Sequence, residues 1–195
     1  MKNEFADIPQ LLKRRLLRDE DPPTLRLIRE MRHVRRRGFF TKDEFIRMCR
    51  WKSPRPQRFY EANAEAEVID ASREVFAAGC ERRRIELLTS LKGVSVPTAS
   101  AILTLTNPRS YGVIDIRVWQ LLYRYGCVNV KPAGTNFSFD NWSDYLRKLR
   151  YWADELGVGA RVVERTLFEY HRETQGGVLY KRSNVKRPAS QRVAQ

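Results

Sequence analysis

The sequence predicts an all-α protein, and three observations support that prediction. Apolar residues recur at the three- and four-residue spacing of a helix face through most of the chain. Residues that commonly begin helices, such as Asp7, Asp21 and Thr41, stand directly before several of these segments. No segment alternates apolar and polar residues in the way that marks a strand. The expected structure is therefore a bundle of helices.

The first helices have clear start and stop signals. Asp7 is expected to cap the first helix, and the stretch Asp21-Pro22-Pro23-Thr24 to break the chain and begin the second. Gly38 ends that second helix. Thr41 and Glu44 have the spacing of a capping box and predict a third helix, because each side chain can bond a free amide at its start.

The stretch from Ile85 to Leu122 organises the rest of the chain. Its apolar pattern predicts a helix, a tight turn through Lys92-Gly93-Val94-Ser95, a second helix, and a third helix that begins at Asp115. Further helices are expected from Asn63 to about Ala78, from Asn141 to Leu156 and from about Ala160 to His171. An irregular loop should occupy residues 128–135.

A proline-rich loop is expected at residues 50–58, where four cations surround Trp51. Pro54 and Pro56 should keep this loop extended. Cations can neutralise phosphates while a flat ring stacks on or wedges against a base, so the loop could face DNA. The alternative is a solvated loop with Trp51 folded onto the core.

The net charge of +14 over 195 residues indicates a polyanionic partner. There is no run of about 18 apolar residues, and the N-terminus lacks the apolar core of a signal peptide, so we expect no membrane association and a cytoplasmic location, near the nucleoid in a bacterium. The three cysteines form no CxxC pair, and the two histidines lack partners, so neither a metal site nor a disulfide framework is expected.

The turn at residues 92–95 is a candidate phosphate site. Backbone amides at a helix N-terminus favour an anion, and Gly93 permits both the tight turn and close approach of a phosphate. Ser95 can cap the following helix, and Pro97 fits its first turn. The alternative is a plain helical hairpin without a ligand.

Two segments resemble a known family. LKGVSVPTASAIL, followed about a dozen residues later by VIDIRVW, is similar to the helix-hairpin-helix DNA glycosylase superfamily over Leu88 to Leu122. The resemblance implies a two-lobed, all-α fold that binds double-stranded DNA, flips a base and cleaves its N-glycosidic bond. It implies a catalytic role for Asp115 and contacts with the DNA backbone from the hairpin residues Lys92, Gly93, Val94, Ser95 and Thr98.

The sequence departs from the family pattern at three positions. Pro97 stands where relatives that also cut the DNA strand carry a lysine, which predicts a monofunctional enzyme without hairpin-lysine lyase activity. Ser95 replaces the second glycine of the hairpin, which leaves open whether the hairpin holds a monovalent cation, and Arg117 replaces a histidine. Lys52 and Lys92 are amines that could act as nucleophiles, although each is expected to contact phosphate. The cysteines of an iron-sulfur loop are missing, so no cofactor other than that cation is expected.

We expect one glycosylase-like unit over residues 1–175, acting as a monomer. Its first lobe should comprise residues 1–60 and 157–175, its second lobe residues 61–156 with the hairpin motif at 85–106, and a basic, disordered tail should follow at 176–195. Candidates for a base pocket or wedge are Trp51, Lys52, Tyr111, Arg117 and Trp119.

The substrate stays open between an oxidised, alkylated or mismatched base, as in base-excision repair, and a bulky base of phage DNA, as in antiviral defence. The alternative function is a non-catalytic helix-hairpin-helix DNA-binding protein, and an RNA-binding basic protein is a third.

Overall fold

The computed structural model describes residues 4–176 and 179, and within these residues it contains ten α-helices and no strand. The predicted all-α class is confirmed. The helices are α1 (Ile8–Arg15), α2 (Pro22–Arg37), α3 (Lys42–Lys52), α4 (Gln57–Glu61), α5 (Glu65–Ala77), α6 (Glu81–Thr89), α7 (Val96–Thr106), α8 (Ile116–Arg124), α9 (Phe139–Leu156) and α10 (Ala160–Thr174).

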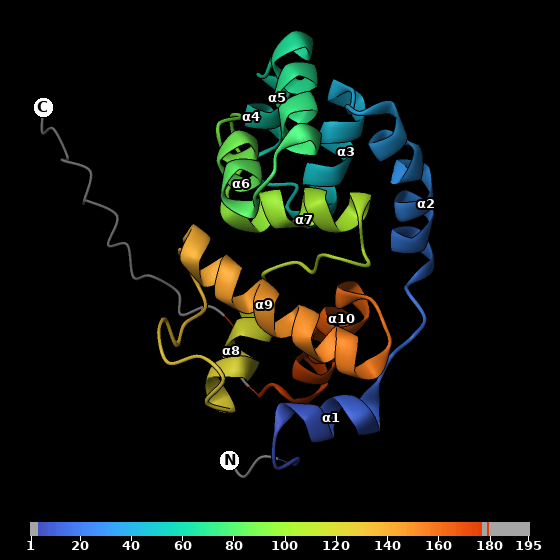
Figure 1. Ribbon diagram of the computed structural model, residues 1–195. Coiled ribbons are helices and arrows are strands. Elements are labelled where there is room, and N and C mark those ends of the chain that lie inside the picture. The colour runs from blue at the N-terminus through green and yellow to red at the C-terminus, as the bar shows by residue number, and fades with distance from the viewer. Residues whose placement is uncertain (1–3, 177–178, 180–195) are drawn as a thin grey trace, which may run out of the picture.

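The helices form two groups that share one hydrophobic core. Helices α2 to α7 pack together, and α1, α8, α9 and α10 form the other group, as Figure 1 shows. Helix α9 contacts both α6 and α7, so the two groups are joined through it. The buried apolar residues belong to one continuous cluster that includes Phe45 from one group and Trp142 from the other. Such a shared core favours folding as one cooperative unit.

Several predicted helix boundaries are confirmed. Asp7 and Asp21 accept hydrogen bonds from backbone amides in the first turns of α1 and α2. Gly38 ends α2 in the left-handed conformation at φ 81°. Thr41 and Glu44 form the expected capping box at α3. These signals act within one helical turn, so they could be identified from the sequence alone.

The proline-rich segment differs from the extended loop that we expected. Helix α3 continues through Trp51 and Lys52, and the short helix α4 begins at Gln57. The loop is therefore limited to residues 53–56. Ser53 is extended, with φ −155° and ψ 112°, because the following Pro54 disfavours helical backbone before it. Trp51 and Lys52 thus lie on the rigid last turn of a helix.

The observed grouping also differs from the expected lobes. The expectation placed residues 1–60 with 157–175, whereas α2 packs mainly against α7, and α3 packs mainly against α4, α5 and α7. Of the first three helices, α1 is the one that packs mainly against α10. The apolar face of a helix shows that it is buried, but not which helix covers it. The basic tail lies outside the described residues, apart from residues 176 and 179.

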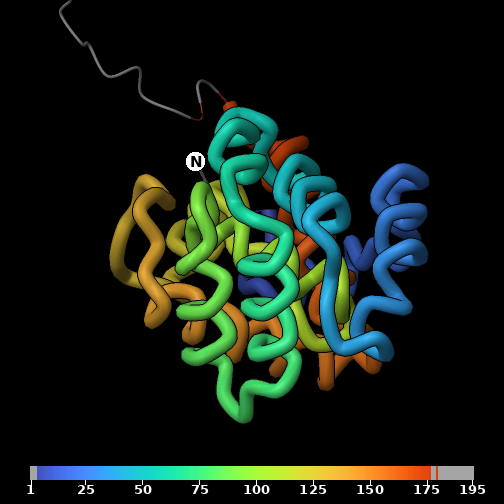
Figure 2. Tube along the Cα trace, turned by 90° about the horizontal axis from the view of Figure 1, so that it is seen from above, coloured from blue at the N-terminus to red at the C-terminus, as the bar shows by residue number. Residues whose placement is uncertain are grey.

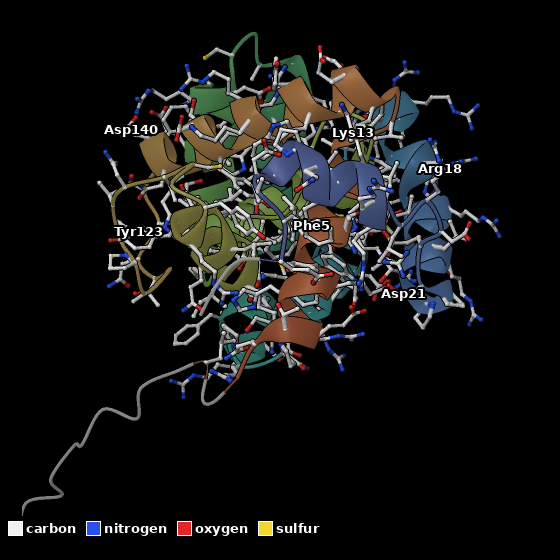
Figure 3. The ribbon with its side chains drawn as sticks, turned by 90° about the horizontal axis from the view of Figure 1, so that it is seen from below. Phe5, Lys13, Arg18, Asp21, Tyr123 and Asp140 are labelled. Atoms are coloured by element: carbon white, nitrogen blue, oxygen red, sulfur yellow. The ribbon has the colours of Figure 1, made fainter. Side chains whose placement is uncertain are left out.

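Two further views complete the arrangement. Figure 2 shows α2 at one edge of the molecule and the loop before α9 at the opposite edge. Figure 3 shows α1 across the underside, and the segment with Arg18 and Asp21 leading from it to α2. Within the described part of the chain, no helix combines the length and the hydrophobicity needed to cross a membrane.

Candidate functional site

Asp115 lies where the segment leaving α7 enters the second group of helices. It is the N-cap residue of α8, and its Oδ1 accepts a hydrogen bond of 2.9 Å from the amide of Arg117. A carboxylate at this position lies at the positive end of the helix dipole. The charged side chain is thus fixed by its own helix.

The residues before Asp115 are anchored from both groups of helices. The amide of Ile114 donates to Oγ of Ser100 in α7 at 3.1 Å, and the carbonyl of Val113 accepts a hydrogen bond of 2.8 Å from Oη of Tyr145 in α9. Ile114, Ser100 and Tyr145 are buried. Because buried polar groups rarely give up their partners, this segment holds the start of α8 in place.

The second carboxylate oxygen of Asp115 contacts a lysine from the other group of helices. Nζ of Lys52, the last residue of α3, lies 2.5 Å from Oδ2. The two side chains are only 18% and 15% exposed, for lysine and aspartate respectively. The ion pair therefore connects the end of α3 with the start of α8, at the residue for which the family resemblance implies a catalytic role.

Lys52 and Asp115 line two pockets at once. The first, which we term the α10 pocket, has a volume of about 660 Å³, and its other lining residues include Thr24, Trp51, Arg161, Glu164, Arg165 and Phe168. The second, which we term the hairpin pocket, has a volume of about 680 Å³, and its other lining residues include Arg55, Gly93, Ser95, Pro97, Thr98 and Phe137. The ion pair thus forms part of the wall of both pockets, where the hairpin pocket adjoins the α10 pocket.

The hairpin turn depends on Gly93 for two reasons. Its φ of 85° lies in the left-handed region that L side chains rarely adopt. A Cβ at this position would also lie 2.8 Å from Cβ of Phe59 and 2.9 Å from Cδ1 of Tyr60. The turn therefore packs directly against α4, which is the element that sequence reasoning missed.

Asn63 fixes the preceding residue of the turn. Its Oδ1 accepts a 2.8 Å hydrogen bond from the amide of Lys92, and its Nδ2 donates to the carbonyl of Lys92 at 3.1 Å. Nζ of Lys92 donates to the carbonyl of Ala62 at 3.1 Å. Asn63 is buried, so its two bonds with Lys92 are partly shielded from water. The structure holds the turn rigidly, and it directs Lys92 toward α4 and away from Asp115.

Four amides at the start of α7 have no hydrogen-bond partner among the described residues. They belong to Gly93, Ser95, Val96 and Thr98. Ser95 is the N-cap residue, but the expected side-chain cap is wrong, because its Oγ lies 3.2 Å from Oγ1 of Thr98 and bonds no amide. Free amides at a helix N-terminus suit an anion such as a phosphate.

A buried ionic network supports the α10 pocket. Nε of Arg161 donates to Oε2 of Glu20 at 2.7 Å, and its Nη1 contacts Glu164, which is 2% exposed. Burial raises the pKa of Glu164, although the charge of Arg161 opposes that shift. The guanidinium also lies over the ring of Trp51 at 5.4 Å from its centroid. Arg161 thus contacts the ring of Trp51 and the buried carboxylates of Glu20 and Glu164 at the same time.

Only two of the five predicted pocket residues line the pockets, namely Trp51 and Lys52. Trp119 is 1% exposed, and its Nε1 donates to the carbonyls of Val130 and Lys131. It is a core residue whose polar atom is satisfied by a loop.

Tyr111 and Arg117 also lie outside both linings. Oη of Tyr111 donates to Glu81 in α6 at 2.9 Å. Arg117 points toward α10, where its Nη1 donates to Oε1 of Gln175 at 2.7 Å and its guanidinium lies 5.7 Å from the ring centroid of Phe168. The orientations of Tyr111 and Arg117 depend on where α6 and the end of α10 pack. The residues that flank Tyr111 and Arg117 in the sequence give no information about that packing.

The sequence analysis missed Asn63, Arg161 and Glu164 as parts of the site. The three-residue spacing of Arg161 and Glu164 was a detectable signal for an ion pair on one helix face, but exposed pairs share this spacing. Nothing local indicated that the pair would be buried. In residues 4–176 and 179, no cluster of three or more histidine, cysteine, aspartate or glutamate side chains is suited to hold a metal ion.

The chain was compared with models of known protein families, with characterised proteins and with solved structures, and none of them matches it.

Proposed function

We propose that this chain is a DNA glycosylase of the helix-hairpin-helix type, which flips a modified base of double-stranded DNA and cleaves its N-glycosidic bond with Asp115. The observation that carries the proposal is the position of Asp115 on the wall shared by the hairpin pocket and the α10 pocket. A residue that served only as a helix cap would not need to line a pocket.

The hairpin supports the DNA-binding part of the proposal. Three of the residues with free amides, Gly93, Ser95 and Thr98, line the hairpin pocket together with Arg55 of the loop between α3 and α4. Such groups bind phosphate without reading the base sequence. The net charge of +14 would attract the DNA over longer distances. The two groups of helices then correspond to the two lobes that the resemblance implies, with the DNA at the hairpin.

The α10 pocket is the proposed place for the flipped base. Trp51 and Phe168 supply aromatic surface, and arginine and carboxylate side chains supply hydrogen bonds for a base edge. Breaking the glycosidic bond leaves positive charge on the sugar, which the carboxylate of Asp115 can stabilise. Pro97 has no amine, so the hairpin itself contributes no lyase chemistry.

The test is release of a base from DNA. Duplexes with oxidised, alkylated, mismatched or bulky bases, and modified phage DNA, are incubated with the wild type and with Asp115→Asn, and free base and abasic sites are measured. Release that is lost in Asp115→Asn supports the proposal. Equal release by both proteins removes Asp115 from the reaction, and tight DNA binding without release from any substrate favours the non-catalytic DNA-binding protein.

A further inference from the structure

Helix α2 carries four arginines on the face that points away from the core. They follow one another at spacings of three, three and four residues, which places them on one side of a helix. We term this set the arginine stripe, and its members are Arg26, Arg29, Arg32 and Arg36. All four residues are exposed, whereas Ile28, Met31 and Val34 are buried. The stripe therefore faces solvent at the edge of the molecule, where Figure 2 shows no helix outside α2.

The stripe is not neutralised by the protein itself. Within residues 4–176 and 179, none of its guanidinium groups takes part in an ion pair. The one acidic residue of α2, Glu30, contacts Arg47 of α3 instead. Arg73, Arg82 and Arg83 on α5 and α6 are also more than half exposed, but each contacts a carboxylate. The lack of a partner is therefore not shared by all exposed arginines of this chain.

Such a set of like charges disfavours the helix that carries it. Side chains three and four residues apart are neighbours on a helix, and equal charges at that spacing repel each other. The helix dipole favours cations only near the C-terminus, so it can stabilise Arg36 but not Arg26 or Arg29, which lie in the first half of α2. The phosphates of a bound polyanion would relieve this repulsion.

The length of the stripe suits duplex DNA. From Arg26 to Arg36 the helix rises about 15 Å, and the same length of B-DNA carries about four phosphates on each strand. The planar guanidinium group can hold a phosphate through two parallel hydrogen bonds. A membrane fits less well, because among the described residues none of the exposed large apolar side chains belongs to α2, and a helix on a membrane inserts such side chains.

The stripe begins beside the α10 pocket. Thr24, in the first turn of α2, lines that pocket, and Arg26 follows two residues later. The hairpin residues line the other pocket, and Asp115 stands on the wall of both. A duplex that is held by the hairpin and places a flipped base in the α10 pocket would therefore also pass the start of α2.

We infer that the arginine stripe is a second DNA contact, which holds phosphates of the duplex beside the α10 pocket. This inference rests on the DNA-binding part of the proposed function and not on base excision. Contacts with phosphates read no base sequence, so the stripe adds affinity without sequence specificity. It extends the bound stretch of duplex beyond the hairpin.

The test is the salt dependence of binding to an unmodified, fluorescently labelled DNA duplex, so the natural base need not be known. The full-length protein is compared with a stripe variant that combines Arg26→Gln, Arg29→Gln and Arg36→Gln, by anisotropy at several salt concentrations. Each lost phosphate contact lowers the slope of log K against log salt by about 0.9, so we expect a decrease of about 2–3. Affinity at about 0.1 M salt should fall by about tenfold or more.

The matched control combines Arg73→Gln, Arg82→Gln and Arg83→Gln. It removes the same number of charges, but from arginines that already have carboxylate partners, so it should keep the wild-type slope. Thermal unfolding verifies that both variants are folded. Equal slopes in the wild type and the stripe variant, or equal decreases in both variants, would overturn the inference. A loss of affinity for duplex RNA with none for duplex DNA would also overturn it.

Base release from the modified duplexes is measured separately, with the wild type. Release by the wild type together with an unchanged slope in the stripe variant would reject the stripe alone. A reduced slope without release of any base would support the stripe and reject the glycosylase proposal alone. A wild type that binds no duplex DNA would overturn both.

Discussion

Lys52 at the end of α3 and Asp115 at the start of α8 are 63 residues apart in sequence and 2.5 Å apart in space. Each comes from a different group of helices, so the site exists only when both groups are assembled. Their ion pair is also the boundary between the hairpin pocket and the α10 pocket. Chemistry at this point would depend on the packing of the whole molecule.

Asp115→Asn should separate catalysis from stability. Asparagine can still accept the hydrogen bond from the amide of Arg117, because it is as good an N-cap residue as aspartate. The variant loses the charge, so we expect base release to fall by about 10²-fold or more, while the free energy of unfolding changes by no more than about 2 kcal/mol. Single-turnover assays and urea denaturation measure the two effects.

The control for this substitution is Asp140→Asn. Asp140 lies in the first turn of α9 and its side chain is 81% exposed. Asp140→Asn should change neither the rate of base release nor the free energy of unfolding measurably. Equal losses of activity in the two variants would indicate an unspecific effect of charge.

Gly93→Ala should destabilise the protein and weaken DNA binding. The substitution combines an unfavourable φ with contacts of 2.8 and 2.9 Å to Phe59 and Tyr60. The expected loss in the free energy of unfolding is about 2–4 kcal/mol, from backbone strain and overpacking. Thermal unfolding and DNA titration at fixed salt measure the outcome.

Gly126→Ala provides the comparison, since Gly126 has a φ of 68° but open space around its Cβ position. It should lose only about 1 kcal/mol, the cost of the backbone conformation. If both variants lose the same amount, the contact of the hairpin with α4 contributes nothing.

Arg161→Met should be strongly destabilising, because it leaves Glu164 buried without its cation. Removing one partner of a buried ion pair typically costs about 3–5 kcal/mol. Adding Glu164→Gln to this variant should recover a large part of the loss, since a neutral amide needs no counter-charge. Urea denaturation of the wild type, both single variants and the double variant gives the coupling energy. Additive losses would show that the two side chains act independently.

Stability should fall in mild acid because of His171. Burial, with the charges of Arg124 and Arg117, lowers the pKa of this side chain to about 4, against about 6.5 in an unfolded chain. Between these values the unfolded chain binds a proton that the folded protein does not, so stability is lost as pH falls. The His171 contribution from pH 7 to pH 5 is about 2 kcal/mol.

Urea denaturation of the wild type and of His171→Asn at the two pH values isolates this contribution. The variant should lose about 2 kcal/mol less than the wild type over that range. His33→Asn serves as the control, because the side chain of His33 is 50% exposed. An unchanged pH dependence in His171→Asn would mean that the pKa of His171 is the same in the folded protein as in the unfolded chain.

Features set by interactions between residues close together in the sequence could be predicted, whereas features set by contacts between distant residues could not. The all-α class and the starts of α1, α2 and α3 were predictable, because periodicity and capping operate within a few residues. The lobe boundaries were not, because an apolar face does not specify its partner. Trp119 and Tyr111 were proposed for a pocket on residue type alone, and packing buries both.

The sequence by itself determined the helices, the turn at Gly93 and the place of Asp115 at a helix start, since local backbone preferences suffice for each. Only the tertiary structure decided that Lys52 meets Asp115, that Asn63 holds the hairpin and that Arg161 and Glu164 are buried together. The first two contacts join residues that are far apart in the sequence, and the burial of the third pair depends on how other helices cover α10. Side-chain identity sets what a residue can do, and the burial of apolar surface decides which residues it meets.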